Sequence, residues 1–108
     1  MPDLAVIYST FGSLESARQA ASSLVEERLL ACANLLPGAT SIYRWEGATH
    51  TDPEVVLIGK TRADLVEAAI ARLQALHPYE IPCITSWPIT ASSTSYADWI
   101  DQSVAGTR

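Results

Sequence analysis

The sequence predicts an α+β fold in which an antiparallel sheet carries two helices on one face. Strand-like and helix-like segments follow one another in the order β-α-β-β-α-β, the order of the ferredoxin-like split βαβ fold. The second and third strands are long and meet at a tight turn, which indicates a long hairpin. A chain of 108 residues has room for one hydrophobic core, so residues 1–108 are expected to form one domain.

The first strand and helix have the clearest pattern. Residues Leu4 to Phe11 are almost continuously apolar or β-branched, which predicts an inner strand covered on both faces. Gly12 ends this strand, and Ser13 can cap the helix that follows. Arg28 is expected in the last turn of that helix, where a cation is favoured. The apolar residues of the helix recur at helical spacing: Leu14, Ala17, Ala21, Leu24 and Val25.

The next two strands are expected to overhang their own domain. The outgoing arm runs from Ala31 to Trp45 and is interrupted at Pro37-Gly38. The returning arm runs from Ala48 to Thr61 and is broken at Asp52-Pro53. Arms of about fifteen residues reach roughly 50 Å, whereas a domain of about 100 residues has a radius of gyration of only about 13 Å. The outer half of the hairpin therefore needs a partner.

A second helix follows the hairpin. Thr61 and Asp64 resemble a capping box, which predicts that the helix begins between them, and Pro78 stops it. Its apolar face is formed by Leu65, Val66, Ala69, Ile70, Leu73 and Leu76.

The last third of the chain begins with a connector rich in proline, residues 77–82. A short strand from Cys83 to Trp87 follows and is ended by Pro88. Ser95 and Asp98 are expected to begin a final short helix. Its predicted packing face consists of Tyr96, Trp99, Ile100 and Val104.

Composition indicates a protein that associates with itself. Hydrophobic residues make up 48% of the chain and charged residues only 18%, so a monomer would expose much apolar surface. Tyrosine and tryptophan are favoured in protein interfaces. Tyr43 and Trp45 on the overhanging hairpin, together with Trp87, are the expected interface residues.

Charge and patterning exclude several classes of partner. The net charge is −5 and the basic residues are scattered, which argues against nucleic acid and anionic membranes. No apolar run approaches the roughly 20 residues of a membrane span, and the N-terminus lacks the pattern of a secretory signal. A cytoplasmic location is expected, with Cys32 and Cys83 as free thiols that are buried as small hydrophobic residues.

The connector gathers three different metal-ligand types. His77, Glu80 and Cys83 follow at intervals of three residues and offer an imidazole, a carboxylate and a thiolate. Imidazole and thiolate suit copper or another divalent transition metal. The alternative is that Pro78 and Pro82 make this segment a purely structural corner.

Cys32 is a further candidate, because its small neighbours would let another group approach the sulfur; the alternative is a packed core thiol. His77 can likewise be a helix-end histidine without a ligand role. A thiolate–imidazolium pair of Cys32 and His77 would suit a cysteine-nucleophile enzyme. No nucleophile elbow and no glycine-rich phosphate loop is present, so neither an enzyme nor an organic cofactor is expected.

Several stretches together resemble one known family across nearly the whole chain. They are Glu26–Gly38, Thr40–Gly47, Lys60-Thr61, His77–Pro82 and Tyr96–Ile100. They resemble the CutA divalent-cation-tolerance family. The resemblance implies a ferredoxin-like homotrimer in which each hairpin extends the sheet of a neighbouring subunit.

The resemblance also implies a function. It suggests a role in tolerance of divalent metals, copper especially, with metal bound in a cleft between subunits near Cys32, His77 and Glu80. Cys83 departs from the family pattern, which usually has an acidic residue at this position, and is a further candidate ligand. The trimer is similar to that of the PII nitrogen-signalling proteins. The alternative function is therefore a non-enzymatic sensor or adaptor trimer that binds a protein or a small ligand.

Overall fold

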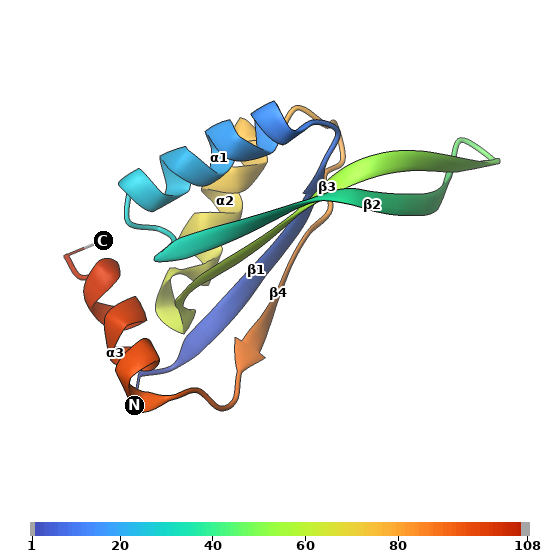
Figure 1. The fold of residues 1–108 in the computed structure, drawn as a ribbon. Coiled ribbons are helices and arrows are strands. Elements are labelled where there is room, and N and C mark those ends of the chain that lie inside the picture. Colours follow the sequence, from blue (N-terminus) through green and yellow to red (C-terminus); the bar gives the residue numbers. More distant parts are fainter. Residues whose placement is uncertain (1, 107–108) are drawn as a thin grey trace.

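The computed structural model describes residues 2–106. Its sheet is antiparallel with the strand order β2-β3-β1-β4. The strands are β1 (Leu4–Phe11), β2 (Cys32–Trp45), β3 (Ala48–Arg62) and β4 (Ile84–Ile89). Helices α1 (Leu14–Glu26) and α2 (Val66–Leu76) lie against one face of the sheet (Figure 1). The predicted order of elements, with a final helix, is confirmed.

The main core lies between the sheet and these two helices. Alternate residues of β1, such as Ile7 and Phe11, point toward the helices and are fully buried. They meet apolar residues that the helical spacing of α1 and α2 places on one side: Ala17, Ala20, Ala21, Leu24, Ala69 and Leu73. Ser13 caps α1 as predicted, because its hydroxyl oxygen accepts a hydrogen bond from the Ser16 N–H at 3.1 Å.

Helix α3 (Thr94–Ser103) covers one end of the opposite face of the sheet. Ile100 and Val104 are fully buried there, next to Leu4 at the start of β1. Tyr96 and Trp99 are exposed, so their predicted place on the packing face is wrong. The helix also begins at Thr94, with Ser93 at the N-cap position instead of Ser95. The rest of this face has no helix over it, and we call it the open face (Figure 1).

The hairpin of β2 and β3 projects beyond the body (Figure 1), and the longest dimension of the molecule is 45 Å. The predicted interruption at Pro37-Gly38 is confirmed as a shift in register between Leu36 and Ala39, with Gly38 at φ +92°. The predicted break at Pro53 is wrong, because Pro53 pairs with Thr40 without a shift. The projecting part has only two strands, so each strand has a free edge where proline is tolerated.

Two boundary predictions are also wrong, because each residue is held by a partner distant in sequence. Arg28 lies beyond α1 at φ 61°, and its guanidinium donates to the carbonyl of Ala105 at 2.9 Å. Thr61 is still paired with Ala5 in the sheet and does not cap a helix; the chain instead enters α2 through a 3-10 turn, η1 (Ala63–Leu65).

Strand β4 continues through Pro88 to Ile89, because β4 is an edge strand and an edge accommodates proline. Among residues 2–106, no helix has the length and apolar character that a membrane crossing requires.

Candidate functional site

Cys32 begins β2 on the open face. It lies opposite Lys60 of β3, and its sulfur is 3.4 Å from the hydroxyl oxygen of Tyr96 on α3. The residue is half-buried, so it is neither a fully packed core thiol nor a freely exposed one. The sulfur is therefore accessible to a metal ion, and to a second chain if that chain covers the open face.

Tyr96 joins Cys32 to Lys60. The hydrogen bond with Cys32 and burial together raise the pKa of Tyr96 to about 12, so the phenol stays protonated at neutral pH. The Lys60 ammonium lies 5.8 Å from the centre of the Tyr96 ring, within the range of a cation–π contact. Within residues 2–106, Lys60 forms no ion pair with a carboxylate. Its charge is therefore met by an aromatic ring alone.

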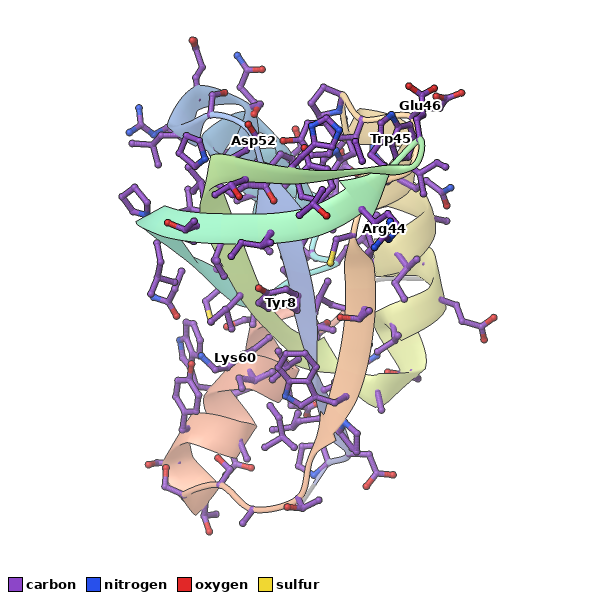
Figure 2. All side chains as sticks on the ribbon, turned by 90° about the vertical axis from the view of Figure 1, so that its right-hand side faces the viewer. Tyr8, Arg44, Trp45, Glu46, Asp52 and Lys60 are labelled. Atoms are coloured by element: carbon purple, nitrogen blue, oxygen red, sulfur yellow. The ribbon has the colours of Figure 1, made fainter. Side chains whose placement is uncertain are left out.

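The open face continues from this cluster toward β4 as an aromatic surface. Tyr8 and Lys60 both lie on it (Figure 2). Trp87 packs beside Tyr8 with ring centroids 5.8 Å apart, yet 46% of its surface remains exposed. Exposed, adjoining aromatic rings of this kind are typical of surfaces that are covered by another molecule.

His77 follows α2 and is buried at the far end of β1, with 7% of its surface exposed. Its Nε2 lies 2.8 Å from the carbonyl oxygen of Thr10, and its Nδ1 accepts the Tyr79 backbone N–H at 3.2 Å. The Nε2 atom is therefore the protonated one. The ring stacks on Phe11 at a centroid distance of 4.1 Å. Burial lowers the pKa of His77, and the Thr10 carbonyl and the Glu54 charge oppose this only in part.

The Tyr79 side chain connects this region to the base of the hairpin. Its hydroxyl donates to Glu54 Oε2 at 2.7 Å, while Ser41 of β2 donates to Glu54 Oε1 at 2.8 Å. Burial and the Glu54 carboxylate raise the pKa of Tyr79 to about 12. Both oxygens of the Glu54 carboxylate thus accept hydrogen bonds at the point where the hairpin leaves the body.

Glu80 and Cys83 are exposed on the connector. The expectation that both cysteines are buried core residues therefore fails for Cys83. The carbonyl oxygen of Cys83 accepts a hydrogen bond from Ser9 at 2.7 Å, which fixes the backbone at the start of β4. The thiol of Cys83 and the carboxylate of Glu80 remain accessible.

The structure does not bring the candidate ligands together within one chain. Cys32 lies level with Val6 of β1 through Lys60, whereas His77 contacts Thr10, four residues farther along the strand. At about 3.3 Å per residue this is a separation of roughly 13 Å. Among residues 2–106, no three potential metal-ligating side chains form a group.

The expected interface residues of the hairpin are exposed. Trp45 lies beside the turn with 40% of its surface exposed (Figure 2). Tyr43 donates a short hydrogen bond to Asp52 and stacks on His50 with a centroid distance of 5.5 Å. The ribbon therefore carries an aromatic surface that residues 2–106 leave exposed.

Sequence analysis missed Glu54, Tyr79, Tyr96 and Lys60 as parts of these two clusters. The contact of Tyr79 with Glu54 joins positions 25 residues apart, and that of Tyr96 with Cys32 joins positions 64 residues apart. Local spacing in the sequence therefore does not predict these contacts. The sequence contains one indication of the second cluster, because the carboxylate of Glu54 lies in a half-buried strand and therefore needs hydrogen-bond donors.

Comparison with known proteins identifies the family. The CutA1 divalent ion tolerance protein family matches residues 5–103. The chain belongs to this family. The CutA1 assignment agrees with the resemblance found in the sequence and with the sheet described above.

Individual CutA relatives support the assignment. The divalent-cation tolerance protein CutA of Thermus thermophilus is 45% identical over 95 residues, which cover 88% of this chain and 92% of the relative. A chloroplastic CutA of Arabidopsis thaliana is 40% identical over 91% of this chain. The chain spans only 54% of that plant relative. A crystal structure of CutA from Xylella fastidiosa superposes with a TM-score of 0.92 at 43% identity, covering 94% of this chain and 98% of that one.

Proposed function

We propose that this chain is a homotrimeric metal-tolerance protein that binds a transition metal ion, copper above all, at the contacts between subunits. The observation that carries the proposal is the position of Cys32. Its thiol lies half-exposed on an aromatic open face, and the described part of the same chain supplies no second and third ligand beside it.

Surface that one chain leaves uncovered supports the proposed trimer. Ile42 on the hairpin is 70% exposed, and Trp45 and Trp87 are also exposed. A projecting two-stranded ribbon is marginal on its own and is stabilised when its edges and apolar face meet another sheet. In a closed ring of copies, every hairpin is covered by a neighbouring copy in the same way.

The available donors fit a soft ion. Cys32 and Cys83 offer thiols, and Glu80 offers a carboxylate on the exposed connector. Thiolates select copper and zinc over magnesium and calcium. His77 remains a candidate, but both of its ring nitrogens are engaged within the subunit, so coordination would require one hydrogen bond to break. The metal is cargo here, and we propose a cytoplasmic protein without enzymatic activity.

A second candidate function is that of an adaptor trimer similar to the PII proteins, which binds a protein or a small anion. Lys60 favours it, because its ammonium has no carboxylate partner within residues 2–106. An anion or an acidic side chain of a partner would supply the missing charge.

Calorimetric titration with Cu(I) and Zn(II) under reducing conditions tests the first candidate. We expect binding by the wild type and a loss of about tenfold or more in affinity for Cys32→Ser, since one metal ligand is removed. His77→Ala tests the remaining candidate ligand. Equal affinity in Cys32→Ser would contradict the proposal. A pull-down from metal-depleted lysate that recovers a stoichiometric partner would favour the adaptor function.

A further inference from the structure

We propose that His77 is a positioning residue, and that His77, Tyr79 and Glu54 form a brace that fixes the hairpin against the body of the subunit. The observation is an unbroken chain of hydrogen bonds from the end of β1, through the connector, to both arms of the hairpin. This assignment concerns contacts within one subunit and stands apart from the proposed metal site.

The inner end of the brace is fixed by His77. Its Nε2–H donates to the Thr10 carbonyl, and its ring lies flat on Phe11, which is fully buried in the main core. The imidazole thus holds the connector to the last residues of β1. Its Nδ1 then accepts the N–H of Tyr79 and sets the direction in which the connector leaves α2.

The outer end is fixed by Glu54. The Tyr79 hydroxyl and the Ser41 hydroxyl donate to the two oxygens of this carboxylate, so the connector, β3 and β2 meet at one group. Glu54 follows Pro53 and faces Ala39, just beyond the bulge of β2. The brace therefore acts at the point where two strands leave the support of the sheet and helices.

Gly12 makes room for the brace. A Cβ atom at this position would lie 2.9 Å from the Tyr79 hydroxyl oxygen. Any other residue would push the phenol away from Glu54. Gly12 therefore leaves space for the Tyr79 side chain, in addition to ending β1.

The brace leaves His77 without a free ring nitrogen for metal binding. A neutral imidazole has one lone pair for coordination, and here that lone pair, on Nδ1, already accepts a hydrogen bond. The brace places the hairpin for contact with another copy, while Cys32, Glu80 and Cys83 are left as the accessible donors.

Side-chain ¹⁵N NMR of the histidines tests the role of His77 directly, with a His50→Gln variant to assign the signals. We expect His77 to show a protonated Nε2 and an unprotonated Nδ1, and to keep this pattern when Zn(II) is added to saturation. A change of the Nδ1 signal to that of a metal-bound nitrogen would overturn the assignment. The zinc-free pattern does not depend on metal binding, so the metal proposal can fail while this one stands.

Amide hydrogen exchange tests the brace, with Tyr79→Phe and Glu54→Gln as variants. Tyr43→Phe is the matched control, because Tyr43 also donates to a carboxylate of β3, that of Asp52, but within residues 2–106 its hydroxyl forms no hydrogen bond with the connector. We expect Tyr79→Phe and Glu54→Gln to speed exchange about tenfold in both the connector (77–83) and the base of the hairpin. Tyr43→Phe should affect the outer hairpin alone. Unchanged exchange at the hairpin base in Tyr79→Phe, or equal effects of all three variants on the connector, would contradict the brace.

Discussion

The Cys32 sulfur and the Tyr96 hydroxyl oxygen lie 3.4 Å apart, although 64 positions separate the two residues in the chain. The contact joins the start of β2 to α3 and places the thiol at the border between the end of the sheet that α3 covers and the open face. Tyr96 therefore limits access to the sulfur that we propose as a metal ligand.

The first prediction concerns that contact. In a Cys83→Ser background, Tyr96→Phe should lower the rate at which Cys32 reacts with a thiol reagent by roughly two- to tenfold, because the reacting thiolate loses the hydrogen bond from the phenol. Tyr8→Phe is the control, since Tyr8 is also on the open face but packs on Trp87. The contact has no influence on the thiol if Tyr96→Phe and Tyr8→Phe react at the same rate as the parent.

The second prediction concerns Gly12. Replacing it by alanine should lower the free energy of unfolding by about 0.5–1.5 kcal/mol, because the new methyl group meets the Tyr79 hydroxyl at 2.9 Å and displaces it from its hydrogen bond with Glu54. Adding Tyr79→Phe removes the oxygen and leaves ring carbons 3.7 Å from the methyl group, so part of the loss should be recovered. Urea unfolding of the two single variants and the double variant checks this. Additive losses without recovery would show that the crowding lies elsewhere.

The third prediction concerns pH. The pKa of His77 is lower in the folded protein than its ordinary value of 6.5, chiefly because of burial, so the native state favours the neutral ring. The stabilisation that this provides is complete above about pH 6.5 and is lost as the pH falls below it, because the unfolded chain then binds a proton more readily.

Unfolding measured from pH 8 to pH 5 on wild type and His77→Gln checks this dependence. The wild type should lose stability in the acid range more steeply than the variant. Parallel curves for the two proteins would exclude His77 as the source.

The fourth prediction concerns the hairpin. Trp45→Ala should destabilise the assembly by about 3–5 kcal/mol, since the indole is expected to fill a site on a neighbouring copy. Leu14→Ala is the control, because Leu14 is similarly exposed but lies on α1, away from the hairpin. That variant should change stability by only about 0.5 kcal/mol. Thermal unfolding at several protein concentrations measures both, and an equal, small effect of the two substitutions would remove Trp45 from the interface.

Much of the fold could be predicted because it depends on local patterns in the sequence, such as runs of apolar residues and helix caps. The buried run from Leu4 to Phe11 and the Ser13 cap are correct to the residue, since strand burial and capping depend on neighbours in sequence. The errors at Pro53 and Pro88 share one cause. Proline is excluded only from paired strand edges, and which edges are free depends on the order of strands, which sequence alone does not reveal.

The candidate site was less accessible to sequence analysis. Spacing placed His77, Glu80 and Cys83 on one connector, which is correct, but their roles depend on partners elsewhere. His77 is engaged by Thr10, which lies 67 positions away in the chain. Tyr96 was assigned to a packing face by helical periodicity, whereas the cation and thiol that it contacts lie on strands.

Sedimentation equilibrium at micromolar concentration tests the central claim most directly, because both the hairpin argument and the shared metal site require several copies. The account predicts a single species of three times the chain mass of 11.6 kDa, which persists on dilution. A folded species of 11.6 kDa, with the ribbon stable in isolation, would contradict it.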